Sequence, residues 1–356
     1  MQTASGTGYP GRTSRRIACR LLVALLAACL WQAGAHAGTT VQDIQKRGAL
    51  RCGVSDAVPG IAAQDSTGRW QGLETDFCRA VAAAVLGDAE RVTFVPLRAS
   101  QRFPALLTNR VDLLLGNTTW TLSREALLGV RFPATLLHDG QSFMVPAESG
   151  AQDPKDLSGA VVCVEKDTTH NQRLRDLATN AGLALQPLIV ESAAAAADAF
   201  FAGRCATLTG EATQLAALRL RAGKSVTDYR ILPRAISREP IGPVVRADDP
   251  AWETIVRWVA YGLILAEECG ITRETADQAH LPVYAEAWGV SNEQEFLMIA
   301  QALGLDLGWQ MRSIRAAGNY GEMFERNLGE RSALGLERGP NRLWKDGGLI
   351  YAPPIK

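Results

Sequence analysis

The chain has 356 residues, of which 47% are apolar and 21% are charged, with 37 basic and 37 acidic residues. This composition is ordinary for a folded protein and excludes a disordered or collagen-like chain. The zero net charge argues against a general nucleic-acid-binding protein, because such a surface needs clustered Lys and Arg. The length predicts two domains of about 100–200 residues each, or one large domain.

The first 37 residues have the pattern of a secretory signal peptide. Four arginines and no acid precede an apolar run, Leu21 to Trp31, and Ala35-His36-Ala37 follows as a small-x-small cleavage site. An N-terminal anchor helix is the alternative, but the run is shorter than the roughly 20 residues that span a bilayer. A lipoprotein is a second alternative, because Leu26-Ala27-Ala28-Cys29 fits a lipobox that would lead to acylation of Cys29. We expect cleavage after Ala37 and a periplasmic location.

Strand and helix patterns alternate after residue 38. A first series of predicted strands and helices runs 49–54, 74–86, 91–97, 100–108 and 111–115, and Ser100 is expected to cap the second helix. A second series runs 160–164, 169–181, 185–190, 193–202 and 205–209. The repeated β-α-β-α-β order predicts an α/β protein with two mostly parallel sheets, each with helices on both faces.

Two extended stretches are predicted to cross between these two series, at 140–145 and 239–246. Two crossings insert the second lobe into the first and create a hinge. The expected division is 1–37 signal peptide, 38–143 first part of lobe 1, 144–241 lobe 2, and 242–356 second part of lobe 1 with a C-terminal extension. The extension contains a predicted helix near 293–303 and is expected to pack back on lobe 1.

Asn117 and Glu211 each follow a short predicted strand that ends in Gly. Ligands of open parallel sheets bind beyond the carboxyl ends of the strands. Two lobes that face each other would therefore place both residues in one cleft.

Several stretches of the sequence resemble the periplasmic amino-acid-binding proteins of polar amino acid ABC transporters, and the general L-amino-acid-binding branch above all. The resemblance extends over nearly all of residues 40–356. It is carried by 68–84 (GRWQGLETDFCRAVAAA), 117–124 (NTTWTLSR), 239–246, 318–327 (GNYGEMFERN) and 351–354 (YAPP). It implies a two-lobed periplasmic-binding-protein fold of type II with two crossing hinge strands.

The resemblance also implies a site for a free amino acid. Arg124, at the start of a helix predicted to be capped by Ser123, would clamp the α-carboxylate, helped by Thr119, Asn117, Thr168 and Thr169. Glu211 would bind the ammonium, and Arg102 would meet the ligand side chain. The alternatives are a solvated cation for Arg124 and Arg102 and a helix-capping surface residue for Glu211. Trp120 could line the cleft.

Three positions depart from the family pattern. Asp167 and Glu211 stand where the family has Gly and Asp, and Ile61 lies where an aromatic platform is expected. Asp adopts positive φ less readily than Gly, so the loop at Asp167 is expected to differ. These departures bear on which amino acid binds rather than on the fold.

Export implies an oxidising compartment, where disulfides persist. Cys52 with Cys78 could bridge within lobe 1 and Cys163 with Cys205 within lobe 2, which would leave Cys269 free. The cysteines show no C-x-x-C spacing and the four His are scattered, so we expect no metal and no cofactor.

We therefore expect a non-catalytic, monomeric receptor that binds free L-amino acids between its lobes and delivers them to the permease of an ABC transporter. A periplasmic cyclohexadienyl (prephenate or arogenate) dehydratase on the same scaffold is the alternative, with Glu211 as general acid if burial raises its pKa. A signalling receptor domain is a third interpretation.

Overall fold

Two β-sheets organise the chain in a computed structural model, which describes Gln2, residues 39–276 and residues 293–355. The first sheet is parallel, with strand order β4 (Val92–Leu97), β1 (Leu50–Ser55) and β5 (Leu113–Leu114). The second sheet has five strands in the order β10 (Gln186–Val190), β9 (Val161–Glu165), β11 (Thr207–Glu211), β8 (Gln141–Pro146) and β12 (Tyr229–Ile231). Its first three strands are parallel, and β8 runs antiparallel to β11 and β12.

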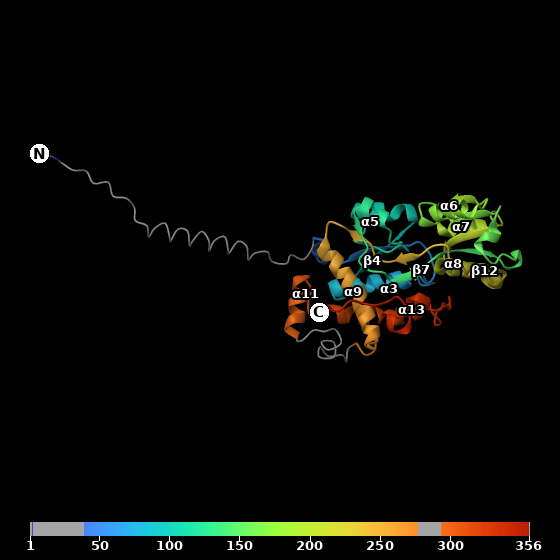
Figure 1. Ribbon diagram of the computed structural model, residues 1–356. Helices are drawn as coiled ribbons and strands as arrows, with labels where there is room; N and C mark the ends of the chain where they lie inside the picture. Colours follow the sequence, from blue (N-terminus) through green and yellow to red (C-terminus); the bar gives the residue numbers. More distant parts are fainter. Residues whose placement is uncertain (1, 3–38, 277–292, 356) are drawn as a thin grey trace.

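Helices accompany both sheets, and Figure 1 shows α6, α7 and β12 together at one end of the molecule. The α-helices are α2 (Thr39–Arg47), α3 (Leu73–Leu86), α4 (Arg102–Leu107), α5 (Leu122–Leu128), α6 (Thr169–Ala181), α7 (Ala193–Phe201), α8 (Ala212–Arg219), α9 (Pro250–Glu268), α11 (Glu293–Ala302), α12 (Trp309–Ala317) and α13 (Tyr320–Asn327). The remaining short strands are β2 (Ala63–Gln64), β3 (Trp70–Gln71), β6 (Val130–Arg131), β7 (Leu137–Asp139), β13 (Glu239–Ile241) and β14 (Val245–Arg246). Short 3-10 helices include η1 (Ala99–Gln101) and η5 (Gly339–Asn341).

The predicted elements are present, and helix α6 has the predicted bounds. Both predicted helix caps are wrong. Helix α5 begins at Leu122, so Thr121 is the extended residue before the first turn, and its hydroxyl accepts the Arg124 N–H at 3.2 Å. Ser123 lies inside that turn, and Ser100 likewise lies inside η1 rather than before it. A cap must be the last non-helical residue, and one residue of shift in the helix start changes its identity.

The crossing between the lobes consists of two paired strands. β7 and β13 run antiparallel, with Leu137 opposite Ile241 and Asp139 opposite Glu239. The chain then enters the second sheet through β8, so the first crossing lies slightly before the predicted stretch 140–145. The sequence-based boundary at 143/144 falls within β8, and the boundary at 241/242 follows the last residue of β13.

Each lobe has its own apolar core and its own disulfide. In the first lobe β1, α3, α9, α12 and α13 share a core whose largest buried side chains include Phe77, Trp252 and Trp309. Cys52 is bonded to Cys78 and Cys163 to Cys205, the two predicted pairs. Cys269 is a free, exposed thiol, as predicted. Disulfides confined to one lobe leave relative motion of the lobes possible.

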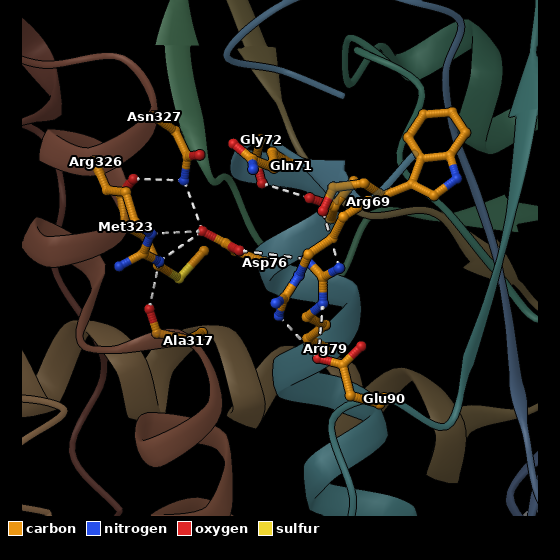
Figure 2. Close-up of polar contacts among 12 residues, drawn as sticks. Arg69, Gln71, Gly72, Asp76, Arg79, Glu90, Ala317, Met323, Arg326 and Asn327 are labelled. Carbon is orange, nitrogen blue, oxygen red and sulfur yellow. Dashed lines mark hydrogen bonds and ion pairs between the residues drawn. The ribbon is translucent and has the colours of Figure 1, made fainter. Parts of the chain in front are cut away.

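The C-terminal segment packs on the first lobe, as predicted. Figure 2 shows the Asp76 carboxylate of α3 between α13 and Arg79. Its Oδ2 accepts hydrogen bonds from Arg326 Nε at 3.1 Å and Asn327 Nδ2 at 2.7 Å. Buried Tyr320 donates its hydroxyl to Leu136 O at 2.9 Å. These bonds join the tail to α3 and to the chain just before β7.

Candidate ligand site between the two lobes

The loop after β5 carries several of the predicted site residues and is fixed by a buried carboxylate. Asn117 has a positive φ of 49°, and its N–H donates to the Glu74 carboxylate. Glu74 also accepts the Ser55 N–H at 2.7 Å and is 4% exposed. Thr119 pairs with Ile241 of β13, and the Trp120 N–H donates to Pro240 O at 2.7 Å. The loop is therefore held by α3, β1 and the hinge.

Sequence reasoning did not single out Glu74. Glu74 stands in the first turn of α3 beside a second acid, Asp76, so its burial has no distinct sequence signal. Burial raises the pKa of Glu74, while hydrogen bonds from Ser55 and Asn117 and the charge of Arg102 act in the opposite direction. A buried carboxylate that accepts several backbone N–H groups makes a rigid support for a binding loop.

Two guanidinium groups lie beside this loop. Arg124 Nη1 donates to Thr119 O at 2.6 Å, and its guanidinium lies over the Phe103 ring at 5.3 Å from the centroid. Arg102 Nη1 donates to Asn117 O at 3.4 Å, and its buried Nε has no partner among the described residues. Burial, and then the charge of Arg102, lower the pKa of Arg124 to about 10. Both guanidinium groups donate hydrogen bonds to backbone carbonyls, and neither forms an ion pair with a carboxylate of the described residues. Their positive charge is therefore available to an anion.

The second lobe presents a buried ion pair. Glu211 ends β11 and is 3% exposed, and its Oε1 lies 3.0 Å from Nε2 of His170, the second residue of α6. Burial opposes both charges, but the attraction between the two groups outweighs it. The pKa of His170 is therefore raised and that of Glu211 lowered. Glu211 Oε2 is buried without a partner among the described residues.

His170 was not predicted, and its neighbours tie it to the crossing strands. Gln141 of β8 donates its Nε2 to His170 O at 3.1 Å and to Thr209 Oγ1 at 2.9 Å. A single His after a Thr-Thr pair carries no sequence signal of its own. Only the fold places it against Glu211, 41 positions along the chain.

The turn before α6 holds the other predicted donors. The Thr168 hydroxyl donates to Glu165 O at 2.8 Å, and the Thr169 hydroxyl donates to Glu239 Oε2 at 3.4 Å. Asp167 has a positive φ of 57° and is exposed. Asp167 thus takes the left-handed conformation that the family pattern assigns to Gly, so the expected difference in this loop is not seen in its φ. Its carboxylate lies in solvent.

Charged residues of both lobes act on one another where the lobes meet, and Trp120 is bonded through its backbone to the hinge. Glu211 and Glu239 act electrostatically on Arg124 across the cleft. The Trp120 ring stacks on Phe132, with centroids 6.0 Å apart and planes 4° apart. Ile61, the third departure, is buried in the first-lobe core. The part of the chain that the structure describes contains no group of three His, Cys, Asp or Glu arranged to hold a metal ion.

The charged groups of this site, Arg124 and Glu211, are suited to ion pairing with a ligand rather than to proton transfer. A general acid at neutral pH needs a raised pKa, and the pKa of Glu211 is lowered by His170. The condition on which the dehydratase alternative depends is therefore not met. Opposed guanidinium and carboxylate groups, one on each lobe, are the arrangement expected of a clamshell binding protein.

The chain belongs to the bacterial extracellular solute-binding proteins, family 3, which match residues 50–281. It is 40% identical over 339 residues to the general L-amino acid-binding periplasmic protein AapJ of Rhizobium johnstonii, covering 95% of this chain and 99% of that protein. It is 41% identical over 328 residues to the glutamate/glutamine/aspartate/asparagine-binding protein BztA of Rhodobacter capsulatus, covering 91% and 95%. A periplasmic binding protein from Brucella ovis with glutathione bound has a TM-score of 0.85 and 38% identity, covering 90% of this chain and 100% of that one.

No helix among the described residues has the length and apolar character needed to cross a bilayer. The predicted leader, 1–37, and its cleavage site lie outside the described residues apart from Gln2.

Proposed function

We propose that the protein is an extracytoplasmic receptor that binds free L-amino acids between its two lobes and delivers them to an ABC-transporter permease. The names of AapJ and BztA support amino acids as ligands. Residues 1–37 would direct export and be removed after Ala37. The receptor would act as a monomer.

The observation that carries the proposal is the position of Arg124. Its guanidinium is largely withdrawn from water, as its lowered pKa reflects, yet it makes no ion pair with a carboxylate of the described residues. Leaving a charge in that state costs free energy, and an incoming carboxylate recovers it with a bidentate pair. We assign the ligand α-carboxylate to Arg124, with donors from Thr119, Asn117, Thr168 and Thr169.

The ammonium of the ligand would pair with Glu211. Its unpartnered Oε2 is free to accept an N–H, while Oε1 faces His170. Glu239 adds negative charge from the hinge. Arg102, which lies beside the Asn117 loop, would meet the ligand side chain. Trp120, held against Phe132, would border the cleft at most through its backbone.

The test is calorimetric titration of the twenty amino acids into the mature protein and into Arg124→Ala. Truncating one partner of a desolvated charge pair costs about 2–5 kcal/mol, so affinity is expected to fall at least about 30-fold. Arg91→Ala is the matched control, because Arg91 is a solvent-exposed arginine of the same lobe. Unchanged affinity in Arg124→Ala would remove Arg124 from the site.

A further inference from the structure

Glu165 is a buried carboxylate of the second lobe that the assignments above leave unused. Glu165 is the last residue of β9 and is only 6% exposed, although the next residue, Lys166, is exposed to solvent. The backbone amide of Ala99, the first residue of η1, faces this carboxylate and acts to lower its pKa. Because Ala99 belongs to the first lobe, this contact crosses the cleft.

Glu165 lies opposite Arg102 in a small cavity between the lobes. The cavity has a volume of about 20 Å³ and is lined by Ser55, Asp56, Arg98 and Arg102 of the first lobe and by Glu165 and Gln214 of the second, among others. That volume holds about one water molecule. An amino-acid side chain can therefore enter only when the lobes open and the contact between Glu165 and Ala99 breaks.

The two buried charged residues that line this cavity, Arg102 and Glu165, have opposite sign and come from opposite lobes, while Asp56 and Arg98 of the first lobe lie at its more exposed side. Arg102 is 7% exposed, its Nε has no partner among the described residues, and its positive charge lowers the pKa of Glu165 more than the charge of His170 does. Glu211 adds negative charge and His170 positive charge to the same carboxylate. A side chain that inserts between the two charged groups meets an anion on one wall and a cation on the other.

We propose that Glu165 is a specificity-determining residue that pairs with the cationic side chain of a basic amino acid, while Arg102 on the facing lobe serves acidic ones. This inference rests on the proposed function and deepens it by naming basic amino acids as ligands. A guanidinium or ammonium group would take the place of the Ala99 N–H on Glu165. A neutral carboxamide such as that of glutamine would hydrogen-bond to either wall.

The proposal makes ligands of different charge respond differently to one substitution. Glu165→Gln removes the anion and keeps the shape, so binding of arginine should weaken at least tenfold and binding of glutamine should change less than threefold. Binding of glutamate should strengthen, because a like charge leaves the cavity. Arg102→Gln should weaken glutamate binding most.

The experiment is calorimetric titration of arginine, glutamine and glutamate into the full mature protein and its variants at one pH and salt concentration. Glu191→Gln is the control, since Glu191 is an exposed carboxylate of the same lobe. Glu165→Ala is a second variant with the same expected order, and circular dichroism confirms folding of each.

Equal weakening of all three ligands in Glu165→Gln would overturn the proposal, as would a wild-type protein that binds glutamine and glutamate but not arginine. A wild-type protein that binds no amino acid would instead overturn the proposed function itself. The two failures are thus separate results of the same titrations.

Discussion

At the scale of single residues, the least replaceable feature of the second lobe is the His170–Glu211 pair. Both side chains are nearly inaccessible to water, and the charge of each compensates the cost of burying the charge of the other. Removing one partner of a buried pair leaves an uncompensated charge, which costs more than the pair itself contributes. The pair also sets which carboxylate oxygen of Glu211 faces the cleft.

This pair predicts a pH-dependent stability difference. The raised pKa of His170 contributes stability that is present below pH 6.5 and is lost as pH rises through that raised pKa. The lowered pKa of Glu211 contributes stability that is present above pH 4.5 and is lost as pH falls. Wild type should therefore exceed His170→Gln by roughly 3–5 kcal/mol near pH 5.5, and by less at pH 8.5.

Urea unfolding of both proteins at the two pH values measures this difference. Gln172→Ala, an exposed position on the same helix, is the control and should shift stability little at either pH. An identical difference at pH 5.5 and 8.5 would show that the two groups are not coupled.

At the scale of elements, the disulfides and the tail hold neighbouring segments of one lobe together. Cys163–Cys205 joins β9 to the turn before β11, and Cys52–Cys78 joins β1 to α3. A disulfide stabilises mainly by restricting the unfolded chain. Neither bond crosses the hinge.

The Cys163→Ala/Cys205→Ala variant is expected to lose about 2–5 kcal/mol of unfolding free energy. Cys269→Ser is the control and should be close to neutral, because Cys269 is already a free, exposed thiol. Chemical denaturation measures both variants. Thiol titration of the unreduced, denatured mature protein should find one thiol, and five would contradict the assigned bonds.

The tail depends on one acidic residue of α3. Asp76→Ala removes the acceptor shared by Arg326 and Asn327 (Figure 2). Arg326 is 40% exposed, so solvent screens its ion pair and most of the cost comes from the buried Asn327 bond. The expected loss is about 1–2 kcal/mol.

Urea unfolding checks this value. Asp88→Ala serves as its control, because Asp88 and Arg91 form an exposed surface pair worth little. A loss in Asp76→Ala no larger than in Asp88→Ala would mean that these bonds do not anchor the tail.

At the scale of the whole molecule, the tail and the hinge are connected. The Asn341 side chain accepts the His138 N–H at 2.7 Å and donates to His138 O at 3.0 Å. Strand β7 is thereby fixed to the first lobe, and rotation of the lobes must be absorbed just beyond it. Gly140 lies there, and a Cβ added to it would lie 2.7 Å from Ala235 Cβ and 2.9 Å from Ser237 O.

Gly140→Ala is therefore expected to push the crossing segments apart and to cost about 1–3 kcal/mol. It should also hinder closure, so that ligand reduces the radius of gyration in small-angle X-ray scattering less than the decrease expected for wild type. Gly262→Ala is the matched control, because its added Cβ would meet Gln310 only at 3.6 Å. A ligand-induced decrease equal to that of wild type in Gly140→Ala would contradict this account.

The sequence determined by itself the elements, the two-sheet architecture, both disulfide pairs and the return of the tail. The elements and sheets follow from local periodicity, and the disulfide pairs from cysteines on elements whose adjacency follows from the β-α-β order. The return of the tail was expected without a local pattern that requires it. The expectation for Asp167 was wrong in this respect: the loop was expected to differ from the family pattern, but Asp167 takes the positive φ of 57° that Gly would take there.

Only the tertiary structure decided which side chains meet. It paired His170 with Glu211, placed Glu74 under the Asn117 loop, turned Trp120 onto Phe132 and set Glu165 opposite the first lobe. Contacts between residues far apart in the chain depend on how two lobes are docked and on burial that no local pattern encodes. Electrostatics strengthens with burial, so the charges that matter most for this site are those that the sequence alone could not bring together.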